Sequence, residues 1–103
     1  MTLGAFEEQV MLAVVRVGEQ AYGMSVRREI RSTAGRGVSI GAVYATLDRL
    51  ESKGFVASTR GEGGGRRIFR ITPAGAHALV ASQAMRERLW EGVSDTVHAL
   101  LSS

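Results

Sequence analysis

Ser39 lies in the stretch GVSIG, residues 37–41, which matches the G-x-S-x-G pattern around the nucleophile of many serine hydrolases. That chemistry needs a buried strand before the serine, with an acid and a base beside it. The preceding residues, STAGRG, are not those of a buried strand. Asp95 and His98, the acid and base in the required order, share one predicted helix far along the chain. We therefore interpret Ser39 as the N-cap of a helix and expect no enzymatic activity.

Basic side chains form the second group with a chemical signature, because they are concentrated in the middle of the chain. Residues 25–70 carry ten basic and four acidic side chains, a net charge of +6, whereas the remaining residues sum to −3. Twelve of the thirteen basic residues are arginine, whose planar guanidinium group suits phosphates and base edges. A solvated surface is the alternative interpretation, but concentration in one segment favours a polyanionic partner.

Three helices are predicted to position these side chains. Residues 3–17 repeat apolar side chains at helical spacing and end at Gly18. A second helix over residues 23–34 places its apolar residues inward and its arginines outward, and AGRG ends it. The third begins after Ser39 and closes at Gly54. Its apolar positions recur at intervals of three and four: Ile40, Val43, Leu47 and Leu50.

The pattern changes period after the third helix. FVASTR at residues 55–60 and RRIFRIT at residues 66–72 favour strands, and the short loop GEGGG separates them, so they predict a β-hairpin. Arg67 is expected on the same face of the second strand as Phe69.

Thr72 and Pro73 then predict the start of a single helix that reaches Leu101, with Gly75 and Gly92 as tolerable glycines. The predicted fold is mostly α with one small β-hairpin.

Three stretches carry a distinctive combination of motifs: AYGMSVRREI at residues 21–30, SIGAVYATLDRLESKGFV at residues 39–56 and RRIFRITPAG at residues 66–75. Together they resemble the PadR-like family of bacterial transcriptional regulators, which are winged helix-turn-helix proteins. The resemblance implies a winged helix-turn-helix DNA-binding domain over residues 1–72, with a recognition helix at about 39–53 and a wing at about 55–72. It also implies that residues 73–103 form a long C-terminal dimerisation helix.

The resemblance implies a function as well: a sequence-specific repressor that binds a near-palindromic operator in double-stranded DNA as a homodimer and is often relieved by a small molecule. The recognition helix would enter the major groove, with Ser39, Gly41 and Tyr44 among its contacts. A winged helix that binds an acidic protein, without specific DNA binding, is the alternative.

Residue types extend the set of candidate DNA contacts. The outward face of the third helix offers further base contacts: Ala42, Ala45, Thr46 and Arg49. Arg49 could instead pair with Asp48 or Glu51 on the surface. Arginines beside the wing loop and on the second helix are candidates for backbone contacts: Arg60, Arg66, Arg67, Arg27 and Arg28.

The last predicted helix carries more apolar residues than a small domain can cover, which predicts a second copy of the chain against it. The expected dimer interface comprises Leu89, Trp90, Val93, Val97, Leu100 and Leu101. Trp90 could line a cavity for a planar aromatic effector, or be an ordinary tryptophan of the dimer core.

Several other functions are not expected. The chain has no cysteine, and its two histidines, His77 and His98, lie far apart without further ligands, so we expect no metal and no cofactor. No G-K-[S/T] follows the glycine loop, so the loop is not expected to hold the phosphates of a nucleotide.

The ends and apolar runs of the chain predict neither secretion nor a membrane span. The acidic N-terminus is not typical of a signal peptide, and the longest apolar run, residues 10–15, is too short to span a membrane. A cytoplasmic protein is expected.

Overall fold

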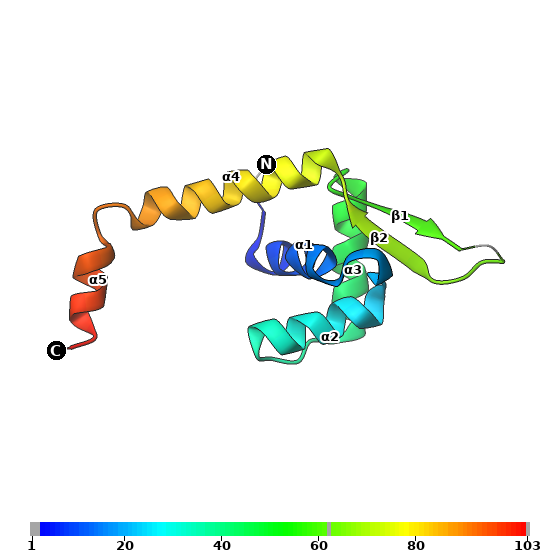
Figure 1. Cartoon of the computed structure of the whole chain (residues 1–103), viewed down its shortest axis with the longest axis horizontal. Helices are drawn as coiled ribbons and strands as arrows, with labels where there is room; N and C mark the ends of the chain where they lie inside the picture. Colours follow the sequence, from blue (N-terminus) through cyan, green and yellow to red (C-terminus); the bar gives the residue numbers. More distant parts are fainter. Residues whose placement is uncertain (1–2, 62, 103) are drawn as a thin grey trace.

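The computed structural model describes residues 3–61 and 63–102. Its elements follow in the order α1 (Ala5–Val17), the 3₁₀ turn η1 (Gly18–Gln20), α2 (Gly23–Ala34), α3 (Ile40–Ser52), β1 (Val56–Arg60), β2 (Arg67–Ile71), α4 (Pro73–Trp90) and α5 (Ser94–Leu100). Figure 1 shows α1, α2, α3 and the hairpin gathered together, whereas α4 extends away from them and α5 turns off its far end. The chain is therefore elongated, 59 × 27 × 20 Å.

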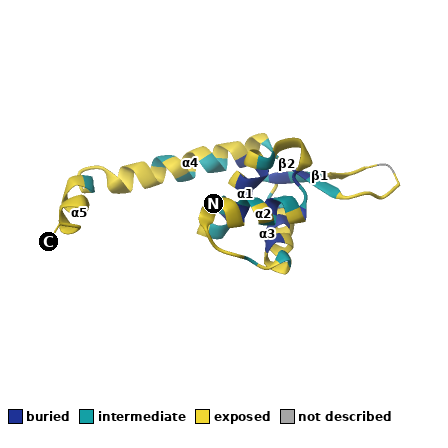
Figure 2. Cartoon of the chain, turned by 60° about the horizontal axis from the view of Figure 1, so that its bottom comes forward, coloured by how far each residue is buried: buried dark blue, intermediate teal, exposed yellow. Residues whose placement is uncertain are grey.

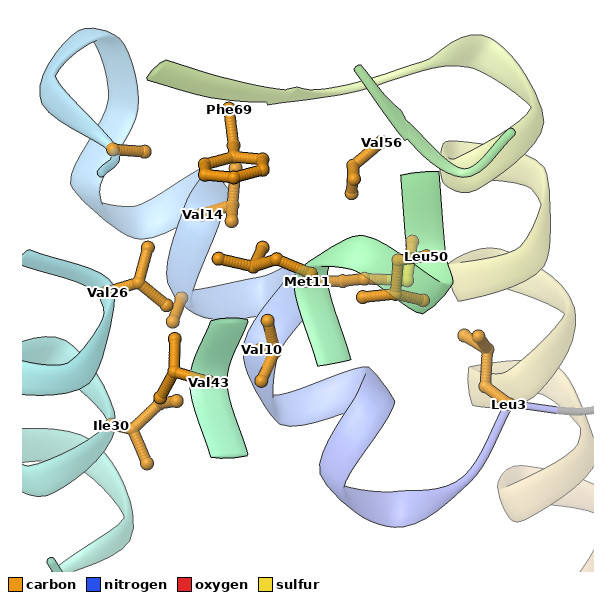
Figure 3. Packing of buried hydrophobic residues seen from close by; sticks show 13 residues of the cluster. Leu3, Val10, Met11, Val14, Val26, Ile30, Val43, Leu50, Val56 and Phe69 are labelled. Atoms are coloured by element: carbon orange, nitrogen blue, oxygen red, sulfur yellow. The ribbon is translucent and has the colours of Figure 1, made fainter. Parts of the chain in front are cut away.

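A small apolar core holds α1, α2, α3 and the hairpin together. Its largest fully buried side chains include Met11 of α1, Leu47 and Leu50 of α3, and Phe69 of β2. Figure 3 shows core side chains from these elements facing one another. Most positions that helical spacing placed inward are buried: Val10, Val14, Val26, Ile30, Val43, Leu47 and Leu50. Phe6, Val17 and Ile40, also placed inward, are half-buried at the edge of the core. The predicted fold class, mostly α with a small β-hairpin, is confirmed.

Local signals set the ends of these helices. Gly18 ends α1 with a φ of 80° and a ψ of −133°, a conformation of positive φ that glycine adopts readily. Ser39 precedes α3, and its Oγ accepts a hydrogen bond from the backbone N–H of Ala42 at 3.0 Å. Such a bond satisfies one of the free N–H groups of the first turn. The interpretation of Ser39 as an N-cap is confirmed.

The hairpin packs on the helices through one face. β1 and β2 pair antiparallel, with Val56 opposite Ile71 at one end and Arg60 opposite Arg67 at the other. Phe69 is buried in the core, and its backbone N–H donates to the carbonyl oxygen of Ala21 at 2.8 Å. This bond ties β2 to the segment that leads into α2, so the base of the hairpin is held while its loop projects outward (Figure 1).

Gly75 lies where the first turn of α4 crosses the backbone of the segment before β1. The hydroxyl of Thr72 accepts from the N–H of Gly75 at 3.0 Å and donates to the carbonyl oxygen of Gly54 at 2.6 Å. A Cβ at position 75 would lie only 2.1 Å from the carbonyl oxygen of Phe55. The expectation that Gly75 is merely tolerated is wrong, because no side chain fits between these two backbones.

The C-terminal segment contains two helices, so the expectation of a single helix to Leu101 is wrong. α4 ends at Trp90, and Gly92 adopts a φ of 79°, which glycine tolerates and which takes the chain out of the helix. α5 resumes at Ser94. Figure 2 shows most of both helices exposed. Among the described residues, no helix is both long and apolar enough to cross a membrane.

A largely buried carboxylate links α1 to the end of α3. Glu7 accepts a hydrogen bond from Lys53 Nζ at 2.7 Å and another from the backbone N–H of Gly4 at 2.9 Å, and Arg49 Nε lies 3.9 Å from the same carboxylate. The bond from Lys53, followed by that from Gly4, holds the pKa of Glu7 below its ordinary value. Helical periodicity does not reveal this contact, because Lys53 lies 46 residues along the chain.

Replacing Glu7 with glutamine should lower the free energy of unfolding by about 1–2 kcal/mol at neutral pH, because it removes a charged hydrogen-bond acceptor. The pKa of Glu7 is lower in the folded than in the unfolded state, so Glu7 adds to the free energy of unfolding at pH values above its unfolded-state pKa. This contribution is lost as the pH falls through its folded-state pKa. Urea denaturation at neutral and acidic pH measures the change. The difference between wild type and variant should shrink on acidification, and Glu87→Gln, on the exposed side of α4, provides the control.

Candidate nucleic-acid interface

α3 presents one face to solvent. Its exposed residues are Gly41, Ala42, Tyr44, Ala45, Asp48, Arg49 and Ser52. Thr46 was predicted on this face, but it is only 2% exposed. That prediction is wrong because Thr46 follows Val43 by three positions and precedes Leu50 by four, which places it within the buried stripe. The exposed face is therefore made of small side chains, with Tyr44 and Arg49 as its larger members.

Two glycines shape this face in opposite ways. A Cβ at Gly41 would meet no atom within 4 Å, so nothing in the folded chain requires glycine there. A Cβ at Gly23, the first residue of α2, would lie 2.3 Å from Cζ of the Tyr44 ring. Gly23 is thus the surface on which the Tyr44 ring rests. The outer surface at Gly41 is left open for a close approach by another molecule.

The Arg49 side chain is more than half exposed, although it contacts two neighbouring residues. Its Nε lies 3.9 Å from the Glu7 carboxylate, and its Nη2 donates to Thr46 Oγ1 at 3.2 Å. Its partner is therefore Glu7 and not Asp48 or Glu51, the two surface partners considered from the sequence. The guanidinium side chain is 57% exposed, so its remaining donors can reach outward.

Arg67 has a role that residue types did not predict. Its Nη1 donates to Asp48 at 3.0 Å and its Nη2 to Glu51 at 2.7 Å, both on α3. Glu51 also accepts from the backbone N–H and hydroxyl of Ser58 on β1. The hydrogen bonds from Ser58, together with Arg67, hold the pKa of Glu51 below its usual value. These contacts fasten both strands to α3 and occupy Arg67, which had been expected to contact the DNA backbone.

The other predicted arginines lie on both sides of α3. Arg27 Nε donates to the carbonyl oxygen of Val38 at 2.7 Å, which holds the loop that leads into α3. Arg60 Nη1 donates to the carbonyl oxygen of Gly65 across the wing loop at 3.3 Å. Arg28 and Arg66 both meet the phenol of Tyr22. A hydrogen bond from Arg28 holds the pKa of the Tyr22 hydroxyl below its ordinary value.

The chain thus has three packed helices and a hairpin that follows the third, with arginines on the second helix and along the hairpin. This arrangement defines a winged helix-turn-helix fold, in which the hairpin of β1 and β2 follows the third helix, α3. Residues 11–81 match the model of the transcriptional regulator PadR-like family. The chain belongs to the PadR-like family of transcriptional regulators.

Known relatives agree with this assignment. The chain is 38% identical to Transcriptional regulator Rv3488 of Mycobacterium tuberculosis over 72 residues. These residues make up 68% of this chain and 66% of the relative, so the match spans slightly less than two thirds of the relative's length. It is 29% identical to the PadR family transcriptional regulator of Eggerthella lenta, with a TM-score of 0.66 over 85% of this chain and 80% of that one. RosR of H. salinarum, 22% identical, shares the fold with a TM-score of 0.72 over 97% and 91% of the two chains.

Members of this family are regulators and not enzymes, and the geometry around Ser39 agrees with that. Ser39 caps α3, whereas His98 lies on α5, where Nδ1 is 2.8 Å from the carbonyl oxygen of Ser94 and the ring stacks on Trp90. The structure therefore does not assemble the acid, base and nucleophile of a hydrolase. In the described part of the chain, no group of three histidine, cysteine, aspartate or glutamate side chains could hold a metal ion.

Proposed function

We propose that this chain is a cytoplasmic repressor that binds a near-palindromic operator in double-stranded DNA as a homodimer. Residues 1–72 would form the DNA-binding domain and residues 73–103 the dimerisation segment; residues 1–2, 62 and 103 of these ranges lie outside the described part. One observation carries the proposal. Basic side chains lie on the elements that precede and follow α3 in the chain, and seven of the ten in residues 25–70 have no carboxylate partner among the described residues: Arg27, Arg28, Arg31, Arg36, Arg60, Arg66 and Arg70.

The exposed face of α3 would read the major groove. Gly41, Ala42 and Ala45 allow the helix backbone to approach the bases closely, and alanine methyl groups can contact thymine methyl groups. Ser39 and Tyr44 lie at the first turns of the helix and can reach phosphates. Arg49, with its partly free guanidinium group, is the candidate for contact with guanine or a phosphate.

Apolar surface on α4 and α5 supports the homodimer. The large apolar side chains exposed there are Val80, Met85, Leu89, Trp90, Val93, Val97, Leu100 and Leu101. So many exposed apolar side chains on one segment are costly to leave in water, which supports an interaction site there. A second copy, related by a two-fold axis, covers this surface and carries a second α3 to a half-site about 34 Å away.

A gel shift with duplex DNA from the chain's own promoter tests the proposal. Sequence-selective retardation that weakens steeply with added salt is expected, because the arginines replace cations condensed on the backbone. Retardation that is equal for any duplex would reject operator recognition. Absence of retardation in dilute buffer would favour the alternative of a protein-binding module.

Replacing Gly41 with alanine should separate DNA binding from stability. The new methyl group meets nothing within the chain, so the helix should become more stable by up to about 1 kcal/mol. The same methyl group would occupy the proposed protein–DNA contact, and operator affinity should fall by about tenfold, equivalent to about 1.4 kcal/mol. Thermal unfolding and a binding titration measure the two effects. Unchanged operator affinity would show that the DNA does not approach Gly41.

We also propose that a planar aromatic compound relieves repression by binding beside Trp90. This residue lies at the end of α4 and is 49% exposed, and its ring stacks with that of His98 at a centroid distance of 6.2 Å. Trp90 is the only tryptophan in the sequence, so intrinsic fluorescence reports on this position alone. Saturable quenching by flat aromatic compounds is expected. Quenching no stronger than that of free tryptophan, for every compound, would leave Trp90 as part of the dimer core.

A further inference from the structure

Tyr22 lies just before α2, where two arginines from different elements meet its ring. Arg66, next to the start of β2, places its guanidinium carbon 4.0 Å from the centroid of the Tyr22 ring. Arg28, on α2, donates from Nη2 to the Tyr22 hydroxyl at 3.1 Å, and its guanidinium carbon lies 5.9 Å from the ring centroid. Stacking on the ring and bonding to the hydroxyl fix both cations relative to one phenol.

The two guanidinium groups contact the same ring, and neither has a carboxylate partner among the described residues. No carboxylate of residues 3–61 or 63–102 pairs with Arg28 or Arg66. Arg67, the next residue after Arg66, has two such partners on α3. Two cations held on one phenol repel each other, and an anion placed between them removes that repulsion while accepting hydrogen bonds from both. The arrangement is therefore suited to a phosphate.

The position of Tyr22 connects this pair to the recognition helix. Tyr22 directly precedes Gly23, the residue on which the Tyr44 ring of α3 rests. A molecule that contacts α3 at Tyr44 therefore lies near the segment of Tyr22 and Gly23, and Tyr22 contacts Arg28 and Arg66. Because Arg28 belongs to α2 and Arg66 to the wing, a ligand held by both also fixes the wing relative to the helices.

We propose that Tyr22 is a positioning residue that organises Arg28 and Arg66 into one phosphate-binding site, which holds a single phosphodiester group of the DNA backbone. The inference rests on the proposed function for its ligand. It adds that the two arginines act as one unit, and that Tyr22 acts through them without touching the DNA.

A double-mutant cycle on operator binding tests whether the two arginines act together. Arg28→Gln and Arg66→Gln should each weaken binding by about tenfold. The double variant should be about ten- to twentyfold weaker, well short of the hundredfold product. Its slope of log affinity against log salt should fall by about 0.9, the value for one phosphate. Arg36→Gln, in the loop between α2 and α3, is the matched control, and its effect should multiply with that of Arg66→Gln. Independent effects of Arg28→Gln and Arg66→Gln would overturn the shared site.

Substitutions at Tyr22 test its positioning role. Tyr22→Phe keeps the ring under Arg66 and should weaken binding only about twofold, whereas Tyr22→Leu should weaken it about fivefold and reduce the salt slope although both arginines remain. The midpoint of thermal unfolding should be unchanged in both variants. An unaltered salt slope in Tyr22→Leu would show that Tyr22 does not organise the arginines.

Titration with inorganic phosphate separates this proposal from the proposed function. The Nε–Hε NMR signals of Arg28 and Arg66 should shift along one binding curve in the wild-type protein, and much less in Tyr22→Leu. If these signals shift but no duplex DNA is retained, the site stands and the DNA-binding function fails. If DNA binds while neither phosphate nor DNA moves the two signals together, the function stands and the shared site is rejected.

Discussion

Replacing Gly75 with alanine should lower the free energy of unfolding by about 2–3 kcal/mol, the cost of forcing an extra group into a packed contact between backbones. The alanine Cβ would lie 2.1 Å from the carbonyl oxygen of Phe55, and that oxygen also accepts a hydrogen bond from the backbone N–H of Thr72 at 3.1 Å. Neither backbone can move without loosening the junction between the wing and α4. Thermal or urea unfolding measures the loss.

Gly41→Ala is a matched control for this variant, because it makes the same substitution in the first turn of a helix with no neighbouring atom within 4 Å. It should be neutral or stabilising, as alanine favours the helix. If Gly75→Ala were as stable as Gly41→Ala, the close contact between α4 and Phe55 would be absent in solution.

The second large effect is expected at Leu89, where replacement by aspartate should dissociate the proposed homodimer. Leu89 is 70% exposed in the single chain, so the folded monomer should retain its helices. In the dimer the charged group would be buried against an apolar surface, which costs several kcal/mol. Sedimentation velocity should show a monomer at micromolar concentration. Operator affinity should fall by about a hundredfold or more, because linked half-site binding is lost.

Gln83→Asp introduces the same charge at an exposed polar position of α4 and serves as the control. It should remain dimeric and should bind the operator with nearly wild-type affinity. A Leu89→Asp protein that sediments and binds DNA like Gln83→Asp would rule out an interface that includes Leu89.

Most of the fold could be predicted from the sequence because its signals are local. Helical spacing identified the buried stripes of α1, α2 and α3, and residue preferences identified both strands of the wing. Ser39 was recognised as a cap because the bond it makes reaches only three residues along the chain. The exposed face of α3 followed in outline, since the residues that face away from a buried stripe face solvent. Thr46 shows the limit of that reasoning, because it lies at the edge of the stripe.

Only the tertiary structure decided which side chains are paired and which glycines are required. Glu7 with Lys53, and Arg67 with Asp48 and Glu51, join residues that no local pattern relates. Gly75 and Gly92 look alike in the sequence, yet one is required by a crossing backbone and the other ends a helix. The arginine composition predicted a polyanionic partner. Folding determined that Arg67 pairs with carboxylates, whereas Arg28 and Arg66 both contact the ring of Tyr22. Such pairing depends on distances in space, which the composition does not contain.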